Sequence, residues 1–315
     1  MSREMRLCTV SMPYAEDRGV EGNLELALRR IEEAASFKPD LICLPETFAY
    51  IGVTIDKVLP EVESIPGPIT NRLAEAARKH GCWIAAGTFA KVDGVDRNSC
   101  FFLDTDGEVR GIYHKMFPTL GEIDAGIVPG HEATVIDSPW GRIGAAICFD
   151  INFHEVMDGL GRNGAQLVLF PSYYHAGMLN SASCFANTYY LASAVVMNAE
   201  TGIGGWLVDP IGQVRASASG EDPIVCAEIN LDFVVAHENC NEQQIEELKK
   251  REDVDIVTTQ RETLAIISAK RESQTAMDIV REMGIELRTD YFNRARQARN
   301  EALASSNVVA RGVSA

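Results

Sequence analysis

The chain has 315 residues, of which 46% are hydrophobic and 23% are charged, an ordinary composition for a globular protein with a large core. Its formal net charge of −16 argues against a nucleic acid or an anionic membrane as its partner. No apolar run approaches the roughly 18 residues that a membrane-spanning helix needs.

Up to residue 115, strand-like and helix-like segments alternate along the chain. Strands are expected at residues 6–12, 40–46 and 82–90. Helices are expected at residues 23–37 and 69–81, where apolar residues recur on one helical face. A hairpin is expected at residues 98–115, because two short apolar runs flank Asp106-Gly107.

The same order of segments recurs after residue 140. An apolar run at residues 143–147 predicts a strand, and apolar residues at helical spacing follow Asp150. The next predicted elements are a strand at 165–172, a helix at 179–192, a strand at 194–198 and a hairpin at 205–217. This recurrence predicts two similar layered halves within residues 1–235.

Residues 236–315 differ in composition from the rest of the chain. No proline follows Pro223, and the segment contains only two glycines, Gly284 and Gly312. Helices are predicted at residues 273–284 and 290–304. This extension is interpreted either as a helical appendage packed on the first domain or as an oligomerisation arm that packs on another subunit.

Cys148 lies where the buried strand at residues 143–147 is expected to turn into a helix. A cysteine there could fill the core, since free cysteine is among the most buried residue types. It could also be lifted into a pocket with helix N–H groups pointing at the sulfur. The residue alone leaves both interpretations open.

Two other predicted strands also end in side chains that can do chemistry. Glu46 follows the strand at residues 40–46, Lys115 ends the first hairpin, and Glu122 comes shortly after it. Each is an ordinary surface residue if taken alone. If they converge on Cys148, a carboxylate could take the thiol proton and the ammonium could stabilise an oxyanion.

These residues lie in motifs that resemble the nitrilase superfamily of carbon–nitrogen hydrolases. The likeness covers roughly residues 5–230 and rests on "LPETF" around Glu46, "YHKMFPTLGE" around Lys115 and "ICFDINFHE" around Cys148, in the order typical of the family. The resemblance implies an α/β fold, namely a four-layer α-β-β-α sandwich of two mixed β-sheets, here followed by the helical C-terminal extension. It also implies a homodimer or higher homo-oligomer.

The resemblance assigns a role to each motif residue. Cys148 would be the nucleophile that forms a thioester, Glu46 the general base and Lys115 the stabiliser of the oxyanion, while Glu122 matches a second, supporting glutamate. The backbone N–H of Phe149 would join the oxyanion hole. Further substrate-binding residues are expected among the following: Asn152, Tyr173 and Tyr174. The family chemistry needs no cofactor and no metal.

The expected function is hydrolysis of a non-peptide carbon–nitrogen bond in a small molecule, either a linear amide or a carbamoyl group. Three alternatives stay open: a nitrile substrate, acyl transfer to an amine, and a non-catalytic assembly scaffold. Asn152 resembles an asparagine of aliphatic amidases and formamidases, which favours a small neutral amide. The eight cysteines are scattered without metal-finger spacing and the N-terminal segment has no signal region, so a cytoplasmic location is expected.

Overall fold

The computed structural model describes residues 3–198, 200–259, 263–271 and 273–305, which form two compact units. The first unit comprises Arg3–Leu231, and the second begins at Asp232. Within the described residues, no helix is long and apolar enough to cross a membrane.

One sheet of the first unit has six strands. In spatial order they are β13 (Ile224–Asn230), β1 (Glu4–Val10), β3 (Leu41–Cys43), β4 (Trp83–Val92), β5 (Val95–Leu103) and β6 (Val109–His114). The neighbours β1, β3 and β4 are parallel, while β13, β5 and β6 are added in antiparallel pairings. The hairpin expected around Asp106-Gly107 is confirmed as β5–β6, and Gly107 has the positive φ of +74° that its turn requires.

The other sheet repeats this arrangement. In spatial order its main strands are β12 (Val214–Ser219), β11 (Ile203–Val208), β10 (Tyr190–Met197), β9 (Leu167–Ser172), β8 (Arg142–Ala145) and β7 (Val135–Asp137). Short strand β2 (Met12–Pro13) also pairs with β10. The strands β8, β9 and β10 are parallel, and antiparallel strands flank them on both sides. The two halves predicted from the recurring pattern therefore correspond to two mixed sheets.

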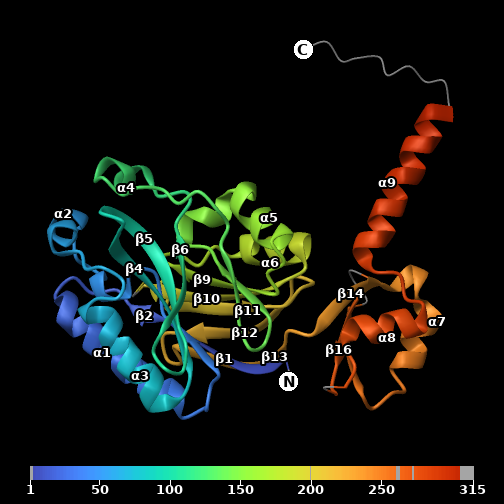
Figure 1. Ribbon diagram of the computed structural model, residues 1–315, viewed down its shortest axis with the longest axis horizontal. Coiled ribbons are helices and arrows are strands. Elements are labelled where there is room, and N and C mark those ends of the chain that lie inside the picture. The colour runs from blue at the N-terminus through green and yellow to red at the C-terminus, as the bar shows by residue number, and fades with distance from the viewer. Residues whose placement is uncertain (1–2, 199, 260–262, 272, 306–315) are drawn as a thin grey trace. The chain divides into compact units, whose positions relative to one another are not determined.

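Helices cover the outer faces of both sheets (Figure 1). On the first sheet lie α1 (Gly19–Ala35) and α3 (Pro68–His80), and on the second lie α5 (His154–Arg162) and α6 (Met178–Asn187). Apolar residues of α1 and α3 share one buried cluster with strand residues such as Ile42 and Ile84. The four-layer α-β-β-α sandwich is thus confirmed.

The helix expected at residues 179–192 ends earlier than predicted. It stops at Asn187, because Thr188 takes a left-handed conformation, and β10 begins at Tyr190. All eight residues of β10 are buried, so this strand shows no alternation of polar and apolar residues. A continuous apolar run of this kind cannot be assigned to a strand or a buried helix from its pattern alone.

The second unit combines helices with a small sheet. Its helices are α7 (Glu242–Leu248), α8 (Ala276–Met283) and α9 (Arg288–Ser305). Its strands β14 (Phe233–His237), β15 (Val254–Thr259) and β16 (Leu264–Ala269) form an antiparallel sheet, against which α8 buries Ala276, Ile279 and Val280. The sequence predicted α8 and α9 but not these strands. The N-cap of α8 is Thr275, so the helix begins later than the start predicted at residue 273.

Candidate active site

The four residues predicted to be catalytic line one pocket in the first unit. Glu46 follows β3, Lys115 follows β6, Glu122 lies on the short helix α4 (Leu120–Asp124), and Cys148 follows β8. The pocket has a volume of about 480 Å³. The structure therefore brings together four side chains that are far apart in the sequence.

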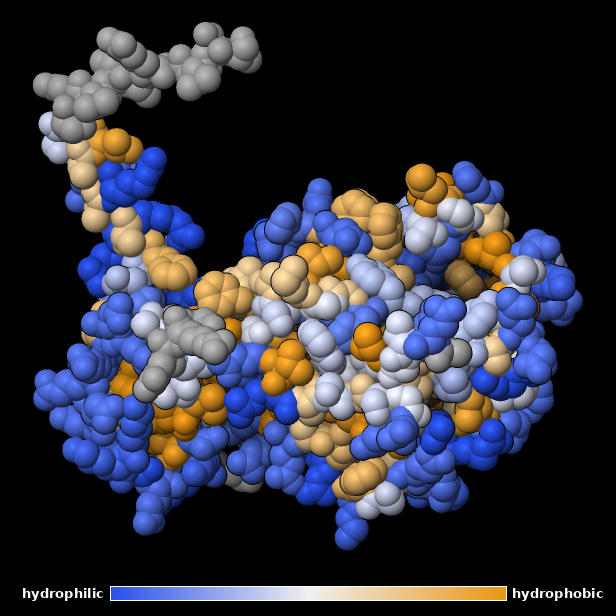
Figure 2. All heavy atoms as spheres, turned by 180° about the vertical axis from the view of Figure 1, so that it is seen from behind, coloured by the Kyte–Doolittle hydropathy of each residue, from blue (hydrophilic) through white to orange (hydrophobic). Residues whose placement is uncertain are grey.

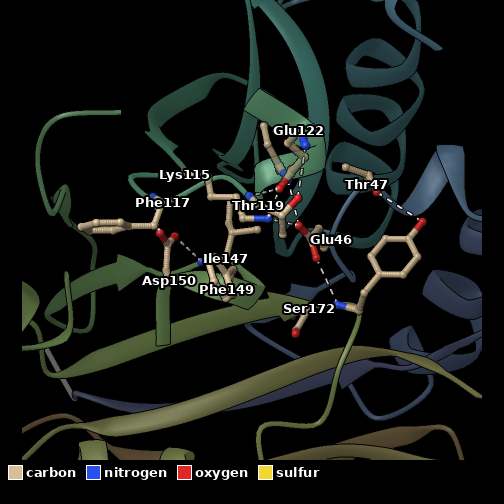
Figure 3. A network of polar contacts seen from close by, with 12 residues as sticks. Glu46, Thr47, Lys115, Phe117, Thr119, Glu122, Ile147, Phe149, Asp150 and Ser172 are labelled. Atoms are coloured by element: carbon tan, nitrogen blue, oxygen red, sulfur yellow. Dashed lines mark hydrogen bonds and ion pairs between the residues drawn. The ribbon is translucent and has the colours of Figure 1, made fainter. Parts of the chain in front are cut away.

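Lys115 is buried between two carboxylates (Figure 3). Its Nζ atom donates a hydrogen bond to Glu46 Oε1 at 2.7 Å and another to Glu122 Oε2 at 2.8 Å. Only 1% of the lysine surface is exposed. An ammonium so far from water needs compensating negative charge, which these two glutamates supply.

Asn98 is a member of this network that the sequence did not reveal. Its buried Nδ2 group donates to Glu46 Oε1 at 2.8 Å and to Glu122 Oε1 at 2.7 Å. Asn98 lies on β5, and its carbonyl accepts a hydrogen bond from the Lys115 backbone N–H. Its position opposite Lys115 in the predicted hairpin was the available signal, since its neighbours Arg97 and Ser99 are polar too.

Backbone groups complete the hydrogen bonding of both carboxylates. The N–H of Tyr173 donates to Glu46 Oε2 at 3.1 Å, and the N–H of Thr119 donates to Glu122 Oε2 at 2.7 Å. Thr119 also caps α4, because its hydroxyl accepts from the Glu122 N–H. Each of the four carboxylate oxygens therefore accepts at least one hydrogen bond, which fixes both side chains in place.

Gly87 on β4 makes room for the chain around Glu46. A Cβ atom at this position would lie 2.7 Å from Glu46 Cα and 2.9 Å from the Pro45 carbonyl oxygen. The backbone carrying Glu46 can approach the sheet this closely only because position 87 has no side chain.

Cys148 lies in a strained turn and not at the start of a regular helix. Its φ angle is +48°, in the left-handed region that residues with a side chain rarely adopt. A 3₁₀ turn, Cys148–Asn152, separates β8 from α5. The turn presents Cys148 to the pocket, as the nucleophile interpretation requires.

The fully buried carboxylate of Asp150 holds this turn (Figure 3). It accepts hydrogen bonds from the Ile147 N–H at 2.9 Å, the Phe117 N–H at 2.8 Å and the Tyr113 hydroxyl at 2.7 Å. Burial raises the pKa of Asp150 to about 6, and these donors limit the rise. Asp150 thus links the Cys148 turn to the segment that follows Lys115.

The electrostatics of the pocket keep the resting thiol protonated. Burial, and then the negative charge of Glu46, raise the pKa of Cys148 to about 12, although Lys115 opposes this shift. Burial lowers the pKa of Lys115, but Glu46 and Glu122 more than offset this, so the net shift is upward. Burial raises the pKa of Glu122, but Lys115 reverses the effect and the net shift is downward.

The remaining pocket wall is uncharged. It is formed by Tyr14, Thr47, Tyr50, Gly52, Val53, Thr54, Ile55, Phe89, Thr119, Gly121 and Tyr173. Among the described lining residues, Lys115 is the only cation, and both of its carboxylate partners are already in contact with it. In the part of the chain that the structure describes, no group of three or more His, Cys, Asp or Glu side chains could hold a metal ion.

The residues predicted to bind substrate lie in different places. Tyr173 lines the pocket, and its hydroxyl accepts from Thr47 at 3.4 Å. Asn152 is exposed, lines a separate hollow of about 120 Å³, and donates to the Phe149 carbonyl and the Tyr174 hydroxyl. Its hydrogen bonds therefore hold the outer side of the nucleophile turn.

Known proteins resemble this chain in sequence and in fold. A profile for the carbon–nitrogen hydrolase family matches residues 7–237. Omega-amidases of Xenopus tropicalis and Xenopus laevis are 29% and 30% identical to the chain, in matches that cover 67% of it and 84% of each relative.

Solved structures agree in fold. An amidase from Nesterenkonia sp. matches with a TM-score of 0.64 and 24% identity, covering 73% of this chain and 91% of that one. A nitrilase-superfamily protein of Saccharomyces cerevisiae matches with a TM-score of 0.62 and 22% identity, covering 72% and 90%. The protein is thus a cysteine-dependent hydrolase built on a nitrilase-type sandwich. More particularly, the chain belongs to the carbon–nitrogen hydrolase family.

Removing the Asn98 amide should impair turnover more than it impairs substrate binding. Asn98→Leu removes one of the two donors that Glu46 and Glu122 share and leaves only the lysine ammonium, a loss worth about 1–3 kcal/mol. If that loss falls on the transition state, kcat drops roughly ten- to a hundredfold while KM changes little. Ser99→Ala is the matched control, because it removes a partly buried hydrogen bond between the next residue of β5 and His114 on β6. Equal kcat values for the two variants would show that Asn98 does not position the carboxylates.

Neutralising Glu46 should make the Cys148 thiol more acidic and yet abolish turnover. Because the Glu46 charge raises the pKa of Cys148, Glu46→Gln should lower that pKa and increase the thiolate fraction at about pH 8. We expect iodoacetamide to alkylate Cys148 faster in this variant than in the wild type, as measured by peptide mass spectrometry. We also expect turnover to be lost. Glu122→Gln is the control and should accelerate alkylation less. Slower alkylation in Glu46→Gln would contradict this electrostatic account.

Proposed function

We propose that the protein is an amidase that hydrolyses a small linear amide through a Cys148 thioester. The proposal rests on one arrangement: Cys148 shares a pocket with an ammonium that two carboxylates hold in place. The names of the relatives, omega-amidase and amidase, favour an amide over a nitrile or a carbamoyl substrate. We place this activity in the first unit, with the second unit as a separate extension.

In the first half of the proposed reaction, Glu46 takes the proton of Cys148 as the sulfur attacks the amide carbon. The carbonyl oxygen becomes an oxyanion, which Lys115 and the backbone N–H of Phe149 stabilise. The carbon–nitrogen bond then breaks, Glu46 passes its proton to the leaving nitrogen, and ammonia or an amine departs. The acyl group remains on the sulfur as a thioester.

The second half reverses the roles of the same groups. Glu46 takes a proton from a water molecule, whose oxygen attacks the thioester carbon. The carbon–sulfur bond breaks, the proton returns to sulfur, and the carboxylic acid leaves. Glu122 explains how Lys115 can stay charged throughout. When Glu46 is protonated and neutral, Glu122 still supplies a negative partner at 2.8 Å.

Cys148→Ala should abolish turnover while the protein stays folded, because the change removes only the nucleophile. Loss of such a residue costs several orders of magnitude in rate. The wild-type protein, quenched in acid during turnover of a panel of amides, should retain an acyl adduct on Cys148 in intact-protein mass spectrometry, and Cys148→Ala should not. Near-normal turnover in the folded variant would exclude Cys148 as the nucleophile.

The substrate of this amidase is proposed to be uncharged. Its pocket wall offers no described cation besides Lys115, so nothing there matches the paired, charge-assisted hydrogen bonds that usually anchor a carboxylate. We expect a higher kcat/KM for a neutral amide than for the matched amide that carries a carboxylate. A clear preference for the carboxylate, abolished by mutating a single Arg or Lys, would overturn this assignment.

We also propose that the protein acts as a homo-oligomer and that α9 contributes to its assembly. From residue 293 onward, every described residue of α9 is exposed. The helix carries mostly hydrophilic side chains (Figure 2). An isolated polar helix is marginally stable in water, so contacts with a second copy would stabilise it.

Ending the chain before Asn293 tests the role of α9. The truncation leaves in place Tyr291 and Phe292, whose rings contact His237. We expect a smaller oligomer by light scattering, with little change in the secondary structure of the remaining residues. An unchanged mass in solution would show that the helix is dispensable for assembly.

The cysteines support a reducing location, for which we propose the cytoplasm. All eight are free thiols in the structure, and most are buried.

A further inference from the structure

Two cysteines outside the active site face each other across adjacent strands. Cys8 on β1 is directly opposite Cys226 on β13 in their antiparallel pairing. Both strands belong to the first unit, and β13 is an edge strand of its sheet. The two thiols are far apart in the sequence, so only the fold brings them together.

The hydrogen bonds that flank this pair define its geometry. The Ser11 N–H donates to the carbonyl of its partner Pro223, and the Leu231 N–H donates to the carbonyl of its partner Arg3. Hydrogen-bonded and non-hydrogen-bonded pairs alternate along an antiparallel ladder. Both bonds lie an odd number of residues from Cys8, so Cys8 and Cys226 form a non-hydrogen-bonded pair.

Non-hydrogen-bonded pairs bring side chains closest together. Their Cα atoms are about 4.5 Å apart, which is within the range of about 4.4–6.8 Å that disulfides span. A hydrogen bond between the Cys8 and Cys226 side chains agrees with this geometry, and burial is the main reason that the pKa of Cys8 is raised. The bridge could therefore form without moving the strands.

Solvent reaches the two sulfurs unequally. Cys8 is fully buried in the cluster beneath α1 and α3, whereas Cys226 is only partly buried on the edge strand. Beside it on the same face, Arg6 forms an ion pair with Glu228. An oxidant therefore meets Cys226 first, and Cys8 is protected until its neighbour has reacted.

We propose that Cys8 and Cys226 are a redox modification site that a hydroperoxide converts into a disulfide. The Cys226 sulfur attacks the peroxide and becomes a sulfenic acid, while the reduced peroxide leaves as water or an alcohol. The Cys8 sulfur then displaces the sulfenic hydroxyl, which leaves as water with the Cys8 proton. Two thiols are oxidised and one peroxide is reduced. A dithiol such as dithiothreitol reverses the modification.

The bridge would fasten the edge strand of the first unit. β13 is the last strand of this unit, and Asp232 begins the second unit two residues after β13 ends. A covalent link to β1 prevents β13 from leaving the sheet in a partly unfolded state. Oxidation should therefore make the first unit more resistant to unfolding.

The test uses the full chain with Cys148→Ala, so that the active-site thiol cannot react. After treatment with hydrogen peroxide, free thiols are blocked with N-ethylmaleimide and the protein is digested without reductant. We expect a linked peptide pair containing Cys8 and Cys226, two hydrogens lighter than the separate peptides and lost after dithiothreitol. The melting temperature should rise on oxidation and fall again on reduction.

Two matched variants in the same background decide the outcome. Cys226→Ser should abolish both the linked peptide and the melting shift, while Cys240→Ser, which removes another partly buried thiol, should change neither. Over-oxidation of Cys226 to a sulfinic acid with Cys8 still free would overturn the proposal. So would a link from Cys226 to any other cysteine.

Discussion

A charged lysine held in the interior by two carboxylates is the constraint on which the active site depends. Moving an ammonium out of water costs several kcal/mol, so Lys115 can be buried only where opposite charges meet it at hydrogen-bonding distance. Glu46 and Glu122 do so, but together they carry one negative charge more than the lysine neutralises. The Asn98 amide and two backbone N–H groups stabilise that excess.

This requirement explains why the pocket lies at the ends of several strands. Glu46 follows β3 and Lys115 follows β6, both in one sheet, while Cys148 follows β8 of the other. The sandwich holds the carboxylate and the ammonium on one side and the thiol on the other. The thiol stays protonated at rest because burial, and then the negative charge of Glu46, raise its pKa.

The sequence predicted the residues of this site better than it predicted their supports. The predicted catalytic residues lie in local motifs, which can be recognised in a single sequence; they are Glu46, Lys115, Glu122 and Cys148. Asn98 was missed because its role arises from contacts with residues distant in the sequence. The same limit applies to the Asp150 and Gly87 contacts, which exist only after the strands have packed.

The secondary structure was predictable where the hydrophobic period was clear. The amphipathic helices α1, α3 and α8 and the hairpin β5–β6 were expected and are present. The start of β10 and the strands β15 and β16 were not, because short apolar runs do not distinguish a strand from a buried helix. Tertiary pairing, which no local pattern contains, decided those segments.

Stability and activity favour different residues at position 148, because the backbone of Cys148 has a left-handed conformation. The conformation suits glycine, whereas the chemistry requires a side chain with sulfur. Selection for stability alone would therefore favour glycine here, and only selection for catalysis retains cysteine. In a descendant of this protein that had lost its activity, glycine could replace the cysteine without cost. The residue at this position would therefore record whether the chain is still under selection as an enzyme.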